Sequence, residues 1–91
     1  MITAELFKRE IIKFAKDIGV NPKEIHIRKM KKKFASCSRK GRLTFDVSLL
    51  NESKEKRYEI ILHELLHLRY PNHGKMFNAI LRHAYRKILK K

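Results

Sequence analysis

One stretch of the sequence, residues 54–70, restricts the fold more than any other. Its spacing predicts a helix that is apolar on nearly all sides, through Tyr58, Ile61, Leu62, Leu65, Leu66 and Leu68. Such a helix must be buried, yet it also carries His63, Glu64 and His67. Burial of polar side chains without partners costs about 1 to 3 kcal/mol each. These three residues therefore need a role that offsets the cost.

His63, Glu64 and His67 form the pattern HExxH. Two histidines four residues apart project from one helix face, so both rings can bind one tetrahedral zinc ion. Glu64 follows the first histidine directly, and its carboxylate can act as a general base toward water on the metal. The alternative is a chance match in which both histidines only make hydrogen bonds.

A third histidine weakens the chance explanation. His73 stands six residues after His67, beyond Pro71-Asn72, a turn that can return it to the same metal. Cys37 is the single cysteine, so a cysteine-rich metal site and an intrachain disulfide are excluded. The sequence thus predicts Zn²⁺ bound by His63, His67 and His73, with Glu64 as the catalytic base. Metzincins share this histidine spacing, but Tyr70 replaces their glycine and the chain is too short for their fold.

The remaining segments predict a small α+β fold. An amphipathic helix is expected from Thr3 to Ile18, with Gly19 as its stop. Three strands follow, at residues 24–28, 34–38 and 43–48, with a hairpin turn at 39–41. The buried HExxH helix should run from Lys54 to Tyr70, and a C-terminal helix from about His73 to Leu89. We expect a three-stranded sheet, an N-terminal helix, a buried active-site helix and a C-terminal helix in one domain, residues 1–91.

The charge balance suggests a second kind of partner. Lys and Arg outnumber acidic residues 23 to 9, for a net charge of +14. Residues 28–33 with Arg39, Lys40 and Arg42 motivate a nucleic-acid-binding module that holds a structural metal. A structural zinc site normally has four protein ligands, however, and three histidines leave one position open. Much of the excess charge is spread over helix faces and chain ends, where it serves solubility, so binding of nucleic acid is not expected to be sequence-specific. No apolar run is long enough to span a bilayer and no signal peptide is evident, which predicts a cytoplasmic protein.

Several segments together resemble the YgjP-like metallopeptidase domain. They are residues 30–38, the Gly41 turn, residues 43–50, residues 63–67, and Asn72-His73-Gly74 with Phe77. The resemblance covers roughly residues 30–83. The short chain and the histidine third ligand make it similar to the minigluzincins, a family of very small metallopeptidases. Phe34 and Ala35 depart from the family's usual Trp and Gly, and Asp46 stands where Asn is common.

This resemblance implies a zinc-dependent metallopeptidase that acts on peptide or protein substrates. It also implies the same ligands and base, a cleft bordered by an edge strand, and latency caused by the C-terminal segment, about 74–91. A zinc hydrolase of a non-peptide bond, such as a phosphoanhydride, is the further alternative. The apolar face of the last helix suggests a homodimer formed through that helix, or simply packing on its own domain.

Overall fold

The computed structural model of the chain describes residues 1–70 and 74–89, without the side chains of residues 88 and 89. Its elements follow in chain order: α1 (Ala4–Ile18), β1 (Glu24–Arg28), β2 (Ala35–Cys37), β3 (Arg42–Asp46), the 3-10 helix η1 (Val47–Asn51), α2 (Lys54–His67) and α3 (Lys75–Leu89). The predicted α+β class is confirmed: along the chain, an N-terminal helix is followed by a three-stranded sheet and then by two further α-helices.

The sheet is mixed and has β3 at its centre, in the order β1-β3-β2. β1 runs parallel to β3, with Ile25 opposite Leu43 and Ile27 opposite Phe45. β2 runs antiparallel to β3, and Ser36 lies opposite Thr44. One edge of β2 is therefore unpaired within the sheet, which leaves its backbone groups on that side available to another strand.

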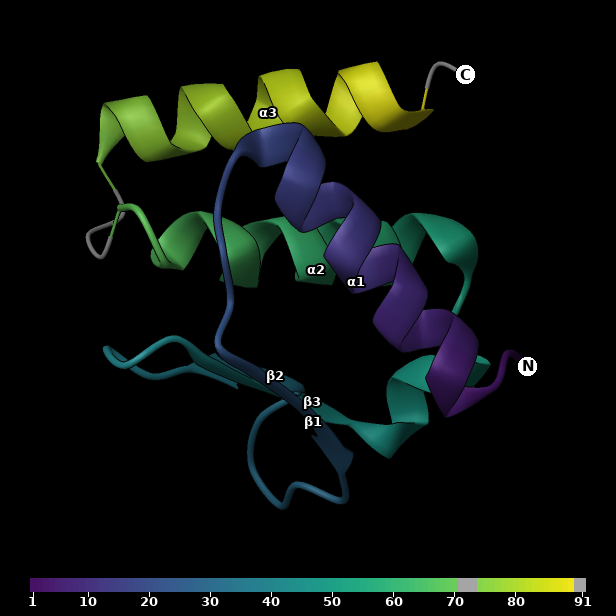
Figure 1. Cartoon of the computed structure of the whole chain (residues 1–91). Coiled ribbons are helices and arrows are strands. Elements are labelled where there is room, and N and C mark those ends of the chain that lie inside the picture. The colour runs from purple at the N-terminus through teal and green to yellow at the C-terminus, as the bar shows by residue number, and fades with distance from the viewer. Residues whose placement is uncertain (71–73, 90–91) are drawn as a thin grey trace.

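Helix α2 occupies the middle of the molecule. In Figure 1 the sheet lies on one side of α2 and α3 on the other, while α1 crosses α2. The core fills the space between α1, α2 and the sheet. Its fully buried side chains come from all three and from η1: Phe7, Ile11, Leu43, Phe45, Leu49, Ile61, Leu62 and Leu65. Burial of so many large apolar groups fixes α2 against the sheet.

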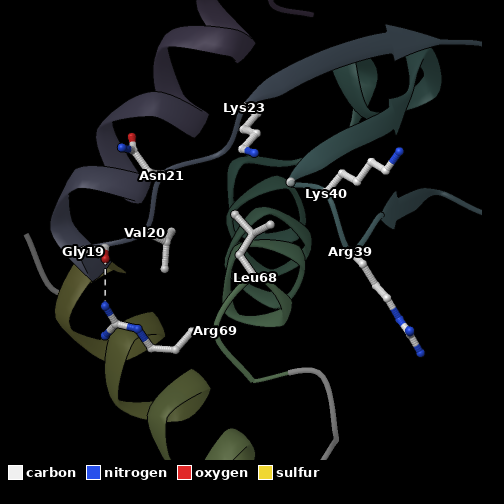
Figure 2. Close-up of a pocket in the computed structure, with 9 residues that line it drawn as sticks. Gly19, Val20, Asn21, Lys23, Arg39, Lys40, Leu68 and Arg69 are labelled. Atoms are coloured by element: carbon white, nitrogen blue, oxygen red, sulfur yellow. Dashed lines mark hydrogen bonds between the residues drawn. The ribbon is translucent and has the colours of Figure 1, made fainter.

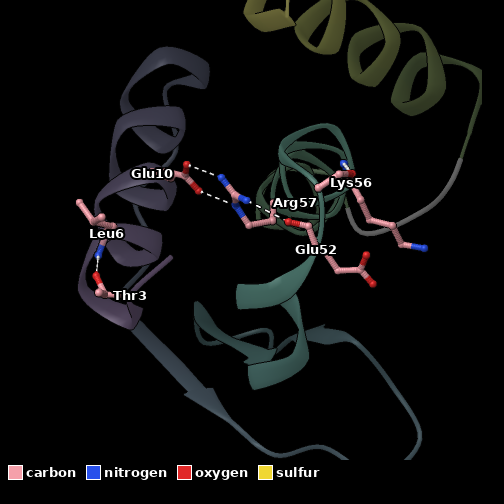
Figure 3. A network of polar contacts seen from close by, with 7 residues as sticks. Thr3, Leu6, Glu10, Glu52, Lys56 and Arg57 are labelled. Atoms are coloured by element: carbon pink, nitrogen blue, oxygen red, sulfur yellow. Dashed lines mark hydrogen bonds and ion pairs between the residues drawn. The ribbon is translucent and has the colours of Figure 1, made fainter. Parts of the chain in front are cut away.

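An ion pair with little exposed surface also joins α1 to α2. The Arg57 guanidinium donates from Nε and Nη2 to the two carboxylate oxygens of Glu10, at 3.2 and 3.0 Å. Its Nη1 donates to the Glu52 carbonyl at 3.1 Å. Figure 3 shows these bonds converging on one guanidinium. Such a two-pronged geometry fixes the rotation of α2 about its axis, and with it the direction of the HExxH side chains.

Most of the predicted boundaries of helices and strands are confirmed. The Thr3 hydroxyl caps α1 by accepting from the Leu6 N–H, and Gly19 ends it with a φ of 85°. The third strand was predicted too long. It ends at Asp46, because the Asp46 carboxylate accepts from the Ser48 N–H and turns the chain into η1. Helix α2 ends at His67, three residues before the predicted end, since the Leu68 N–H bonds back to Leu65 and Leu66.

Candidate metal centre

Helix α2 presents His63, Glu64 and His67 on the face opposite its core residues. Ile61, Leu62 and Leu65 are fully buried, whereas the three polar residues are half-buried. The 3.6-residue repeat of the helix separates the two sets by about half a turn. The polar residues consequently avoid the full cost of burial that a helix buried on all sides would impose.

The two histidine rings converge on one point. Their Nε2 atoms lie 3.3 Å apart. Two nitrogens bound at 2.0 to 2.1 Å to one tetrahedral zinc ion lie about 3.3 Å apart, so the pair fits zinc without rearrangement. A neutral pair at this distance can also share one ring proton as a hydrogen bond. The donor type and spacing therefore suit a metal that prefers imidazole ligands.

The third predicted ligand, His73, lies outside the described residues. Within residues 1–70 and 74–89 there is no group of three or more His, Cys, Asp and Glu side chains placed to hold a metal. The described part thus supplies two ligand candidates on α2. The assignment of His73 stays a prediction.

Phe77, in the first turns of α3, closes one side of the histidine pair. Its ring centre lies 4.9 Å from that of His67 and 5.4 Å from that of His63, and Phe77 is only 1% exposed. An apolar ring at this position restricts the rotation of both imidazoles and excludes water from that side. Helix α3 is thereby attached directly to the site.

Glu64 faces the opposite side, where a cleft opens between α2 and β2. A larger cavity of about 710 Å³ is lined by Ser36, Cys37, Glu64 and His67, among others. A smaller one of about 240 Å³ is lined by Phe34, Glu59, Ile60 and His63. Ala35 and Glu64 line both cavities, so the two join into one cleft with Glu64 at the junction.

Burial raises the pKa of the Glu64 carboxyl above its ordinary value, and the positive charge of Lys33 opposes this shift. A raised pKa makes a carboxylate a stronger base, which is the direction that proton abstraction near neutral pH requires. The pKa of the Cys37 thiol is also raised, by burial and then by repulsion from Glu64. Cys37 therefore lines the cleft as a neutral thiol rather than as a nucleophile.

The structure also adds cleft residues that sequence reasoning missed. Lys33 and Arg39, which flank β2, line the larger cavity together with Glu64. The sequence suggested these cations only as part of a general basic surface. Their proximity to Glu64 follows from the position of β2 beside α2, which the local pattern does not contain.

Comparisons with known proteins agree with this geometry. The sequence-family model of the YgjP-like metallopeptidase domain matches residues 2–90, a longer span than the resemblance over residues 30–83 noted from the sequence. The metallopeptidase zymogen jannalysin of Methanocaldococcus jannaschii is 28% identical and superposes with a TM-score of 0.75, over 92% of this chain and 94% of that one. The zymogen abylysin of Pyrococcus abyssi is 30% identical with a TM-score of 0.68, over 88% and 77% of the two chains.

No curated protein sequence matches the chain significantly. In the part of the chain that the structure describes, no helix is long and apolar enough to cross a bilayer. The family match extends over nearly the whole sequence, and the expected resemblance is confirmed. The chain therefore belongs to the YgjP-like metallopeptidase family, which makes it a hydrolase of peptide bonds with a metal cofactor.

Proposed function

We propose that the chain hydrolyses peptide bonds with one zinc ion held by His63, His67 and His73, and with Glu64 as the general base. The observation that carries the proposal is the convergence of the His63 and His67 Nε2 atoms, 3.3 Å apart, beside a cleft that Glu64 lines. Zinc in such a site acts as a Lewis acid toward water and toward the substrate carbonyl.

The chain's own residues supply orientation and proton transfer. The Glu64 carboxylate accepts a proton from the attacking water and then passes it to the nitrogen of the leaving amine. Phe77 holds the two imidazoles in place from the other side. Lys33, in the same cavity, adds positive charge where the carbonyl oxygen becomes negative during attack.

The substrate is expected to bind along β2 as an additional strand. Ala35, Ser36 and Cys37 line the larger cavity, and their outer edge is unpaired in the sheet. An extended peptide can hydrogen-bond to such an edge through its backbone, which holds the scissile bond near Glu64 without demanding a particular sequence.

The full-length chain is proposed to be latent. The two solved relatives named above are zymogens, and α3 packs against α2 in this chain. Because α3 packs on α2 of its own chain, no contact in the described part of the chain tests the predicted homodimer, which stays a prediction. Truncation after His83 is expected to raise peptidase activity, and light scattering on both forms reports whether the helix also joins two copies.

The test of the proposed chemistry compares two glutamates of α2. Glu64→Ala should retain bound zinc and fold but lose hydrolysis of a fluorogenic peptide by about 10²- to 10⁴-fold, since only the base is removed. The matched control is Glu55→Ala, an exposed residue of the first turn. Equal activity of Glu64→Ala and the parent, in full-length and truncated forms alike, would remove Glu64 from the mechanism.

A further inference from the structure

A second recess with a strongly basic rim adjoins the cleft. We call it the basic pocket; its volume is about 400 Å³ and its charged residues are Lys23, Arg39, Lys40 and Arg69. Arg39 and Leu68 also line the larger cavity of the cleft, so the two recesses share a wall. None of the four cations forms an ion pair with any described residue. Their charge is therefore not compensated from within the described part of the protein.

Backbone hydrogen bonds build the walls of the basic pocket. The Lys23 N–H donates to the Gly41 carbonyl at 2.9 Å, which joins the segment after α1 to the hairpin turn. Gly41 has a φ of 93°, and a side chain there would press against Lys23 at 3.3 to 3.4 Å. The turn thus requires glycine to bring the two walls together.

Arg69, which follows α2, connects that side of the basic pocket to the end of α1. Its Nη2 donates to the Gly19 carbonyl at 2.8 Å, as Figure 2 shows. A guanidinium has five N–H donors, and this is its only hydrogen bond to a described residue, so further donors can serve a ligand. Leu68 lies between Arg69 and the hairpin turn and provides apolar surface, while Arg39 and Lys40 extend outward at the rim. Apolar surface beside cations strengthens their attraction for an anion.

We propose that the basic pocket binds acidic side chains of the peptide substrate and gives the enzyme a preference for acidic residues on one side of the scissile bond. This inference rests on the proposed peptidase function and names its substrate class. A carboxylate suits the site because Arg can bind it through two parallel hydrogen bonds.

The spacing along the chain locates the preferred residue. Leu68, the residue directly after α2, is four residues from Glu64, a rise of about 6 Å at 1.5 Å per residue. A peptide extended along β2 advances about 3.3 Å per residue. The side chain that reaches the basic pocket therefore lies about two residues from the scissile bond.

Nucleic acid fits the pocket less well than a peptide does. A duplex is bound by cations spread along a surface that follows its phosphates. Here the cations surround a recess that shares a wall with the hydrolytic cleft. Arg42, another cation of the same hairpin, already contacts Glu24 at 3.4 Å.

Binding to the full-length, zinc-loaded Glu64→Ala variant tests the inference without requiring turnover. The probes are a neutral fluorescent peptide, the same peptide with two glutamates on one side of its centre, the peptide with them on the other side, and a short DNA duplex. Fluorescence anisotropy should show one acidic peptide binding about tenfold more tightly than the neutral one. Arg39→Glu/Lys40→Glu should abolish this preference, while the control Lys8→Glu/Lys13→Glu, with the same charge change on α1, should keep it.

The outcomes separate this inference from the proposed function. Equal binding of neutral and acidic peptides, or loss of the preference in the α1 control as well, overturns the basic pocket as a subsite. DNA that displaces the acidic peptide and loses affinity in Arg39→Glu/Lys40→Glu assigns the pocket to nucleic acid and likewise overturns it. Failure of both the full-length parent and the form truncated after His83 to cleave a peptide that binds with the expected preference would refute the proposed function and leave the subsite intact. Should Glu64→Ala not fold, Glu64→Gln, which keeps the side-chain shape, replaces it.

Discussion

The two faces of α2 differ in what they contact. One face places Ile61, Leu62 and Leu65 in the core, fully buried against α1 and the sheet. The other places His63, Glu64 and His67 at a cleft, where they keep part of their solvent exposure. Stability and chemistry are therefore assigned to different sides of the same helix, and changes on each side should have separable effects.

The largest contrast should come from neighbouring residues on opposite faces. Leu62→Ala removes a fully buried side chain and should lower the free energy of unfolding by about 2 to 5 kcal/mol. His63→Ala should change it by less than about 1 kcal/mol when a chelator removes metal, because the ring is half-buried. Chemical denaturation in chelator measures both. Similar losses in the two variants would show that the faces are not separate.

A smaller effect is expected at the ion pair that sets the rotation of α2. Glu10→Gln leaves the Arg57 guanidinium, 9% exposed, without its carboxylate partner. The loss should be about 2 kcal/mol, below the 3 to 5 kcal/mol of fully buried pairs, because Glu10 keeps 22% of its exposure. Glu5→Gln, in an exposed pair with Arg9, is the control and should change stability by less than about 0.5 kcal/mol. An equal change in unfolding free energy in the two variants would show that the Glu10–Arg57 pair stabilises the fold no more than an exposed pair does.

The smallest effect concerns Asp46, the last residue of β3. Its carboxylate accepts from the Ser48 hydroxyl and from the Met30 N–H, and these bonds hold its pKa below the ordinary value. A lowered pKa in the folded state stabilises the fold above the unfolded pKa, about 3.9, and this contribution disappears as pH falls through the folded pKa.

Asp46→Asn removes that titration. The difference in unfolding free energy between the parent and Asp46→Asn should be constant from pH 7 to about pH 5 and shrink below about pH 4. Denaturation at several pH values measures it, with Asp17→Asn, an exposed residue, as the control. A difference that does not depend on pH would contradict the assigned hydrogen bonds.

The sequence predicted the parts of this arrangement that local pattern determines. Capping by Thr3, the stop at Gly19 and the HExxH face of α2 each depend on residues within a few positions of one another. The parallel pairing of β1 with β3 was not predictable in this way, because it joins strands 18 residues apart in register. The roles of Lys33 and Arg39 depend on that pairing order, which places β2 at the edge beside α2.

Zinc content tests the central claim most directly. After loading with zinc and removal of unbound metal, elemental analysis of the parent should give about one zinc per chain, as expected for one tetrahedral site. His67→Ala should lose most of it, and His73→Ala should do the same. His83→Ala, an exposed histidine of α3, should retain it. Full zinc in His67→Ala, or an equal loss in His83→Ala, would contradict a metal centre built on the cleft face of α2.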